Sequence, residues 1–343
     1  MLTPRENLLE TIRGGTPEYL VNMRHFIAGV PDPVVMDSVG MCRPGTSGKS
    51  SWGFTIGWPE DAPGPFPIDA PEDRVITDIT KWEEQLHLPD PHAYPDEAWG
   101  MCTMIDSTVD RNEKFVAVET IQGIFEKIHC CIGIEDTLAY FLEEPECMHD
   151  LIEVVTDWHI ELAKEQIARL HPDVLFHSDD FGTQIGTMMS PQVFEEFLLP
   201  AYKRYYGFWH DNGIELIMHH NDAWSATLVP YFIEMGMDIW QGPVSENNVP
   251  ELVKTYGGQI SFMGGIDNGK FDKDGWTYEG ILEWTRKLVN DCGVYYFIPC
   301  LTAAGFESTF PGVYEAVQKA INQVSDEILG AHAPADPPMN FPG

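Results

Sequence analysis

The chain after residue 112 alternates short apolar runs with amphipathic helical segments, and this alternation restricts the fold more than any other feature. Six runs have the length and composition of buried strands, and segments with helical periodicity separate them. Such alternation predicts parallel strands joined by right-handed crossovers. The six runs are residues 115–119, 174–179, 214–219, 237–241, 259–264 and 294–299.

The helical segments begin and end at residues that favour those positions. Thr3 and Glu6 form a capping-box pattern with Pro4 at the first helical position, which predicts a helix at the N-terminus. Ser190 precedes a proline at a helix start, and Gly213 follows a predicted helix end. Longer helices are predicted over residues 145–170, 191–210, 224–235, 249–256, 278–291 and 313–329.

These elements predict an α/β fold of the TIM type, a (β/α)8 barrel forming one domain over residues 1–330. An early apolar segment at residues 19–25 supplies a seventh strand. The eighth strand is then expected within residues 28–100 or near the C-terminus. An open doubly wound sheet is the alternative, and a Pro-rich tail follows at residues 331–343.

Residues 28–100 form a long N-terminal insertion that is rich in proline, glycine and aromatic side chains. A long irregular segment within a compact domain is usually a lid or a binding loop. Trp52, Phe54 and Trp58 would line a pocket for a flat substrate, or would simply pack the insertion against the barrel.

Charge and cysteine content exclude several classes of partner. The 54 acidic residues outnumber the 20 lysines and arginines, giving a formal net charge of -34. Such a surface repels phosphates, so nucleic acid and anionic membranes are not expected as partners. The seven cysteines include no Cys-x-x-Cys pair, and no signal-peptide core begins the chain, so we expect reduced thiols and a cytoplasmic protein.

Polar, chemically active residues follow every predicted strand after the first. In a barrel the carboxyl ends of the strands converge on one mouth, where catalytic groups gather. The alternative for any one position is a polar residue that merely begins a loop. The residues are Glu119, His177, Asp179, Asp180, His219, His220, Asn221, Asp222, Gln241, Asp267 and Cys300.

His219 and Cys300 combine the imidazole and thiolate ligands that zinc prefers. Because side chains alternate along a strand, His219 and Asn221 are expected to share one face, while His220 points to the other.

The chain from Thr3 to about Leu329 resembles the uroporphyrinogen decarboxylase superfamily, particularly its zinc-dependent methyltransferases that serve corrinoid proteins. The motifs that carry the resemblance are TPRENLLETIRGG, HSDDFGTQIGTMMSPQVFEEFLLPAYKR, IMHHND, FMGGIDN and FIPC. The resemblance implies zinc as a cofactor, cobalamin presented by a partner corrinoid protein, and a small methylated substrate. In that branch a strand ends in a His-x-Cys pair and a further Cys follows a late strand, which here match His219, Asn221 and Cys300.

Two departures from the superfamily patterns matter. Asn221 stands where a thiolate is expected, so either the third ligand comes from elsewhere or the site binds zinc more weakly. The candidates for a harder replacement ligand are Glu119, Asp180, Asp222 and Glu246. The decarboxylase branch carries an Arg-Gln-Ala-Gly-Arg-Tyr segment for substrate carboxylates, and this sequence has no such segment. A polycarboxylate substrate would find few partners in so acidic a protein.

The side chains at the strand ends also predict acid–base and substrate-binding roles. Asp179 and Asp180, beside His177, would raise one another's pKa so that one donates a proton. The cluster would otherwise only fix the loop through backbone hydrogen bonds. Predicted substrate contacts are Glu119, Gln184, Tyr202 and Trp52.

The sequence thus predicts a zinc-dependent corrinoid methyltransferase of the O-demethylase type. It would move a methyl group from a small methylated compound to a corrinoid protein that docks at the barrel mouth. An aryl methyl ether is the first candidate for the methylated compound. The alternatives are a uroporphyrinogen decarboxylase-like carboxy-lyase and a non-catalytic barrel that binds a small molecule.

Overall fold

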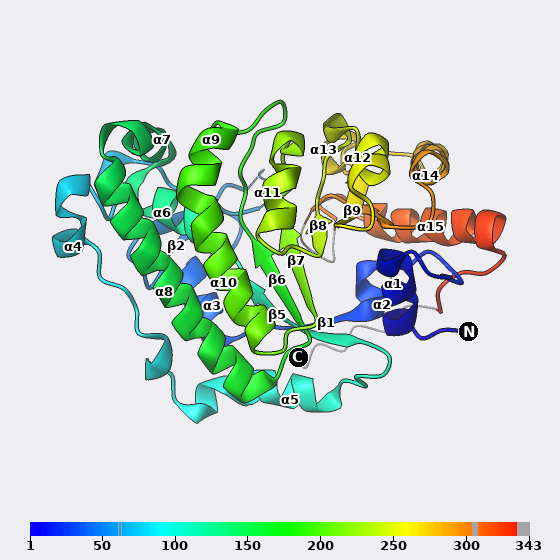
Figure 1. Ribbon diagram of the computed structural model, residues 1–343, viewed down its shortest axis with the longest axis horizontal. Coiled ribbons are helices and arrows are strands. Elements are labelled where there is room, and N and C mark those ends of the chain that lie inside the picture. The colour runs from blue at the N-terminus through cyan, green and yellow to red at the C-terminus, as the bar shows by residue number, and fades with distance from the viewer. Residues whose placement is uncertain (61, 63, 304–307, 335–343) are drawn as a thin grey trace.

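A seven-stranded, entirely parallel sheet forms the centre of the molecule. The computed structural model describes residues 1–60, 62, 64–303 and 308–334. The strands are ordered β1–β5–β6–β7–β8–β9–β10, so each crossover leads to the neighbouring strand (Figure 1). Their bounds are β1 Ile27–Val30, β5 Phe115–Thr120, β6 Val174–Ser178, β7 Leu216–His220, β8 Ile239–Gln241, β9 Ser261–Ile266 and β10 Phe297–Leu301.

Helices cover the outer face of the curled sheet, and α8 and α10 lie side by side along it (Figure 1). The crossover and flanking helices are α1 Pro4–Arg13, α6 Ile124–Ile132, α7 Ile134–Glu143, α8 Pro145–Leu170, α10 Leu199–Asp211, α11 Val229–Glu234, α12 Val249–Tyr256, α14 Tyr278–Cys292 and α15 Val313–Leu329. Shorter helices are α2 Met23–Phe26, α3 Pro33–Val39, α4 Trp82–Gln85, α5 Gly100–Thr108, α9 Pro191–Val193 and α13 Asn268–Phe271.

The strands are apolar on both faces, as expected for parallel strands between two layers. Phe176, Met218 and Met263 belong to a small cluster inside the curl of the sheet. Ile217 and Trp240 belong to the larger cluster between the sheet and its helices. The sheet is therefore a partial barrel with a packed interior, and alternate residues of each strand face the two clusters.

Several helix predictions are confirmed. The predicted bounds 145–170, 249–256 and 313–329 coincide with α8, α12 and α15. At the N-terminus the Thr3 side chain and the Glu6 side chain each accept a backbone N–H of the other, completing the capping box of α1. The predicted helix 191–210 is divided by a π-helical turn at Phe194–Leu198, just before Pro200, which has no N–H for a regular turn.

The early strand predicted at residues 19–25 is wrong. The residues Met23–Phe26 form α2, and the first strand is β1, which begins at Ile27. Tyr19 and Val21 are buried in the inner cluster without pairing as a strand. The apolar run thus reflects burial of a connecting segment, which periodicity alone does not distinguish from a strand.

The expected closure by an eighth strand is not found within the part of the chain that the structure describes. The large sheet has seven strands, and its edges are β1 and β10. What the structure shows is a curled α/β half-barrel of TIM-like form. The predicted Pro-rich tail at 331–343 lies outside the described residues from residue 335 onward.

The segment between β1 and β5 contains a small antiparallel sheet. Its strands are β2 Thr46–Lys49, β3 Thr55–Trp58 and β4 Phe66–Pro67. Trp52 and Phe54 are buried, and their ring centroids lie 5.5 and 5.4 Å from the Lys127 ammonium of α6. These two aromatic side chains pack the segment onto the barrel.

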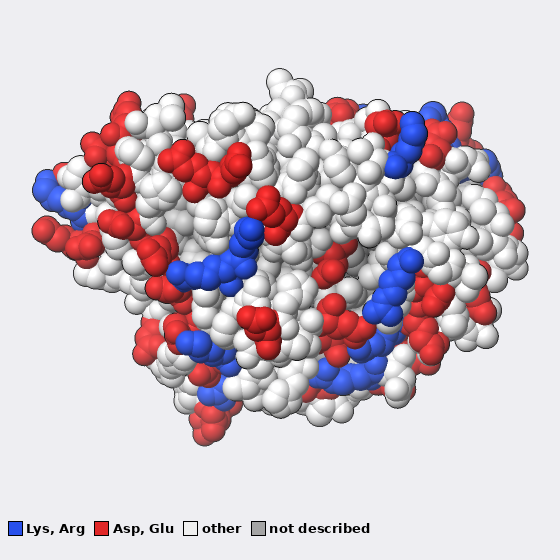
Figure 2. All heavy atoms as spheres, in the orientation of Figure 1, with Lys and Arg blue, Asp and Glu red and all other residues white. Residues whose placement is uncertain are grey.

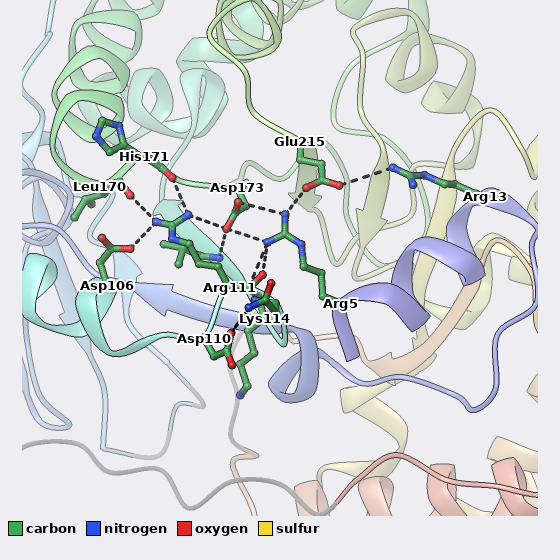
Figure 3. Close-up of polar contacts among 12 residues, drawn as sticks. Arg5, Arg13, Asp106, Asp110, Arg111, Lys114, Leu170, His171, Asp173 and Glu215 are labelled. Atoms are coloured by element: carbon green, nitrogen blue, oxygen red, sulfur yellow. Dashed lines mark hydrogen bonds and ion pairs between the residues drawn. The ribbon is translucent and has the colours of Figure 1, made fainter. Parts of the chain in front are cut away.

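The amino ends of the central strands are joined by a network of ion pairs, which we call the base network (Figure 3). Asp173, just before β6, pairs with Arg5 at 3.3 Å and Arg111 at 3.0 Å. Arg5 also pairs with Glu215, just before β7, at 2.5 Å. Arg111 reaches Asp106 of α5 at 2.6 Å. The network ties the N-terminal helix and α5 to the strand starts.

The outer surface is predominantly acidic, with basic side chains scattered among acidic ones on the face shown in Figure 2. Among the described residues, no helix combines the length and the apolar character needed to cross a membrane.

Candidate metal centre

Three metal-ligating side chains meet where β6 and β7 end. Asp180 follows β6, His220 is the last residue of β7, and Asp222 lies two residues further on. One ligand atom from each lies within 4.8 Å of the others. We call these three residues the mouth triad. Their distance from one another is small enough for a single ion to contact all three.

The register of the sheet explains why these side chains converge. His220 is paired with Ser178 on β6 and with Gln241 on β8. It shares the inward face of β7 with Met218, because side chains of one face recur every second residue. The backbone N–H of Asp222 donates to the Asp180 carboxylate at 3.1 Å, which holds the two loops together.

The electrostatics of the mouth favour a bound cation. Burial raises the pKa of Asp180 to about 7, with a further contribution from the charge of Asp222. Burial and the charges of Asp179 and Asp180 raise the pKa of Glu126, at the start of α6, well above its usual range. In the described residues neither Asp180 nor Asp222 forms an ion pair with lysine or arginine. A divalent ion would relieve this repulsion.

The mouth triad fits a catalytic divalent ion. One imidazole nitrogen and two carboxylate oxygens form a three-ligand set of the kind that leaves one coordination position open for substrate. His220 Nδ1 forms a 2.5 Å hydrogen bond with Gln241 Oε1, so the other ring nitrogen, Nε2, is available as a ligand. Zinc accepts this combination of donors, and so do harder divalent ions.

A cleft of about 610 Å³ opens beside the triad. Asp222 forms part of its wall, and Trp58 of β3 contributes an aromatic side chain. A small methylated molecule would fit a cleft of this size. The described residues around it are Pro44, Trp58, Glu60, Ala62, Asp222, Asn268, Gly269, Asp272, Ala303, Ser308 and Thr309.

Asp179, predicted to be an acid catalyst, instead holds the start of α6. Its carboxylate accepts the N–H groups of Phe125 at 2.8 Å and Glu126 at 2.9 Å, and the Tyr202 hydroxyl donates to it. Burial raises the pKa of Asp179 to about 7, although these hydrogen bonds act to lower it. A side-chain carbon at Gly123 would lie 2.6 Å from Asp179 Cβ, so this close approach requires glycine.

His177 and Tyr202 belong to the same outward-facing layer. The His177 ring lies 5.6 Å from the Tyr202 ring and 5.4 Å from the His219 ring, measured between centroids. His177 is fully buried, and burial lowers its pKa well below the usual range. Of the three predicted catalytic residues, the structure therefore brings only Asp180 into the mouth triad.

The structure places His219 away from the triad. Its Nδ1 accepts a 2.6 Å hydrogen bond from the Tyr206 hydroxyl, and its Nε2–H donates to the Asp179 carbonyl at 2.9 Å. Both ring nitrogens are thus occupied by the protein. Burial lowers the pKa of His219 to about 3, so the ring is neutral.

The other two predicted zinc ligands, Asn221 and Cys300, have different surroundings from His219. Asn221 donates to Ser225 and accepts the Ala223 N–H, which shapes the loop after β7. Cys300 points into the inner cluster, and burial raises the pKa of its thiol to about 12. His219 faces the outer layer, so the sheet separates it from Cys300.

The predicted substrate contacts have different surroundings. Glu119 lies on the inward face of β5, paired with Phe176, and burial raises its pKa. Gln184 is exposed on the loop after β6. Trp52 packs edge-on against Trp158, with ring centroids 4.9 Å apart, and is not among the residues that line the cleft. Trp58, from the same segment, does line the cleft.

His220 and Gln241 are among the strand-end residues that the sequence predicts, but the sequence did not indicate that His220 would be a ligand or that Gln241 would contact it. The alternation of side chains along β7 was predicted correctly, but the face that points to the mouth was not. Leu216 and Met218 are buried on one face and Ile217 on the other, so hydrophobicity gives no sign of which face is inside. β7 ends at His220, one residue later than predicted. A correct strand end would have identified His220 as the last residue of the strand and therefore as a residue of the mouth.

The sequence family described as Uroporphyrinogen decarboxylase (URO-D) matches residues 73–273, more than half of the 343-residue chain. The protein belongs to this family. The matched region contains β5 to β9 and all three residues of the mouth triad.

The chain is also similar to two methyltransferases. It is 23% identical over 291 residues to the methylated-thiol–coenzyme M methyltransferase of Methanosarcina mazei, covering 79% of this chain and 72% of the relative. Its fold is similar to a solved methyltransferase from Methanosarcina mazei, with a TM-score of 0.63 and 11% identity. That likeness covers 94% of this chain and 99% of the other. The structural similarity shows a common fold.

Proposed function

We propose that this protein transfers a methyl group from a small methylated donor to a corrinoid protein. We also propose that a divalent ion binds at the mouth triad, and zinc is the first ion to test. The observation that carries the proposal is the convergence of Asp180, His220 and Asp222 at the strand ends beside a cleft. Membership of the URO-D family and the methyltransferase relative support the reaction class.

The ion would serve as a Lewis acid toward the donor heteroatom and make it a better leaving group. The protein's part is to present and orient the ligands. Asp180 is fixed by the Asp222 N–H, and His220 is fixed by Gln241. Asp222 belongs to both the triad and the cleft wall, so a donor in the cleft lies next to the ligand set.

The cleft favours a neutral or cationic donor over an anionic one. Glu60, Asp222 and Asp272 are the charged residues among its described lining, and none of that lining is lysine or arginine. Trp58 supplies the aromatic surface that a methoxyaromatic compound would contact. The relative's name adds a methylated thiol as a second donor class to test.

The acceptor we propose is a corrinoid protein that docks over the strand ends. Because the triad is set at the rim of the barrel, the docking surface would include the loops after β6 and β7, residues 302 and 303 after β10, and part of the segment between β1 and β5. Such encounters are transient and need only a modest contact area.

The test is anaerobic turnover of the zinc-loaded protein with methoxyaromatic compounds, methylated thiols and methylamines, using reduced corrinoid protein or free cob(I)alamin as acceptor. We expect methylated corrinoid to form, as followed by its absorption spectrum, and the reaction to stop in chelator-treated protein and in His220→Gln. Failure of every donor with folded, metal-loaded protein would contradict the proposal. Uroporphyrinogen serves as a control substrate, and its decarboxylation would favour the carboxy-lyase alternative.

A further inference from the structure

Gln241 lies between the mouth triad and the end of β10. It is the last residue of β8 and is completely buried. Its Oε1 contacts His220 Nδ1 at 2.5 Å, and its Nε2 lies 3.1 Å from the Ala303 carbonyl. The same nitrogen is 3.5 Å from the carbonyls of Leu301 and Thr302.

The three carbonyls determine the orientation of the amide. Carbonyl oxygens only accept hydrogen bonds, so the –NH₂ group of Gln241 must face them and its oxygen must face His220. An oxygen at that position accepts, so a His220 ring that binds a metal carries its single N–H proton on Nδ1. The lone pair is then on Nε2. The backbone of residues 301–303, at and just after the end of β10, thereby selects the histidine tautomer.

The same amide also supports the cleft. Ala303, which receives the shortest of the three contacts, is one of the residues that line it. Movement of the β10 end would therefore alter both the cleft wall and the orientation of His220. Besides these contacts, the Gln241 carbonyl accepts the Asn221 N–H at 2.9 Å, and the Gln241 side chain lies beside the Cys300 thiol.

We propose that Gln241 is a positioning residue that sets the His220 tautomer for metal binding and couples it to the cleft wall at the end of β10. The inference rests on the proposed metal site, but not on the identity of the methyl donor or acceptor. The amide's two ends have separate tasks: the oxygen orients His220, and the nitrogen holds residues 301–303.

Two substitutions separate these tasks. Gln241→Met removes both ends of the amide at nearly the same volume. Gln241→Glu keeps an acceptor for His220 Nδ1–H but loses the donors to the carbonyls. Gln318→Met is the matched control, because Gln318 is a buried glutamine of α15 whose Oε1 has no partner in the described structure.

The first measurement is zinc affinity by competition with a chelator. We expect Gln241→Met to bind zinc about 10–100-fold more weakly than wild type, and Gln241→Glu to remain within about threefold, because a carboxylate can also orient the ligand histidine. Hydrogen exchange of peptides covering Phe297–Leu301 and the following two residues should quicken in both variants. Gln318→Met should change neither quantity. Wild-type affinity in folded Gln241→Met would overturn the proposal.

The second measurement uses the metal-free protein. Nitrogen-15 spectra of labelled histidine, assigned with His220→Gln, should show His220 protonated on Nδ1 in wild type and no longer fixed in that form in Gln241→Met. Protonation on Nε2 in wild type would overturn the proposal. If wild type has this tautomer but binds no divalent ion, the proposed metal site fails while the tautomer assignment stands.

Discussion

The two ends of the barrel contain carboxylates in opposite circumstances. At the base, Asp173 pairs with both Arg5 and Arg111, and Glu215 pairs with Arg5. The nitrogen–oxygen distance in each pair is 3.3 Å or shorter. At the mouth, Asp180 and Asp222 approach one another without such partners, and the pKa of Asp180 is raised to about 7. Figure 3 shows how the base side chains point toward one another from different elements.

This difference indicates that the base stabilises the fold, whereas the mouth serves a ligand. Asp173 also accepts the N–H of Val116 at 2.9 Å, so it joins β5 and β6 as well as two arginines. A partly buried pair of carboxylates without a cation destabilises the protein that carries it. Such a pair is expected where function requires it, as at the carboxyl ends of barrel strands.

The largest effect is expected for activity at the mouth. Asp222→Asn should lower the rate of methyl transfer roughly a thousandfold, about 4 kcal/mol, because the ion would lose a charged ligand. Asp173→Asn, assayed at a temperature where it is folded, should retain most of the wild-type rate. Comparable losses in both variants would remove the functional distinction between mouth and base.

The next effect concerns stability, and its sign should differ between the two ends. Asp173→Asn should lower the free energy of unfolding by about 2 kcal/mol, since both arginines lose a partner at a partly buried site. Asp180→Asn should leave the metal-free protein as stable or raise its stability by up to about 1 kcal/mol, because repulsion with Asp222 is relieved. Urea unfolding with chelator present measures both. A large loss in Asp180→Asn would show that the mouth also holds the fold.

Much of the fold was predictable, because helix caps and strand–helix alternation are local signals. The capping box at Thr3 and Glu6 is an example, and so are the exact bounds of α8. The early strand failed because Tyr19 and Val21 are buried for a different reason, as part of a connecting segment. The prediction of a closed barrel failed because closure would require pairing that involves the edge strands β1 and β10. These strands are far apart in the sequence, so local signals do not show whether the sheet closes.

The sequence predicts where the site lies in the fold, but it does not predict which side chains form it. The strand ends were identified, and Asp180 and Asp222 were among the hard ligands considered. The choice between His219 and His220 depends on the direction in which β7 faces, and both faces of that strand are apolar. The contact of Gln241 with residues 301–303 depends on the register of distant strands, which sequence spacing does not contain.

A smaller effect is expected for Tyr202→Phe. The Asp179 carboxylate would lose the Tyr202 hydroxyl but keep the N–H groups of Phe125 and Glu126. The free energy of unfolding should fall by about 1–2 kcal/mol, and zinc affinity should stay within about twofold of wild type. Thermal or urea unfolding and chelator competition measure these quantities. A large change in KM for the donor with stability unchanged would instead support the substrate contact predicted from sequence.

The most direct test compares the two adjacent histidines of β7, which face opposite sides of the sheet. Zinc affinity is measured by chelator competition for wild type, His220→Gln and His219→Gln, with folding checked by circular dichroism. We predict about one zinc per chain in wild type, loss of binding in His220→Gln, and binding retained in His219→Gln. Should His219→Gln fail to fold, Tyr206→Phe, which removes only the hydroxyl bonded to His219, takes its place and should bind zinc normally. Binding that persists in folded His220→Gln would contradict the assignment of the metal centre to Asp180, His220 and Asp222.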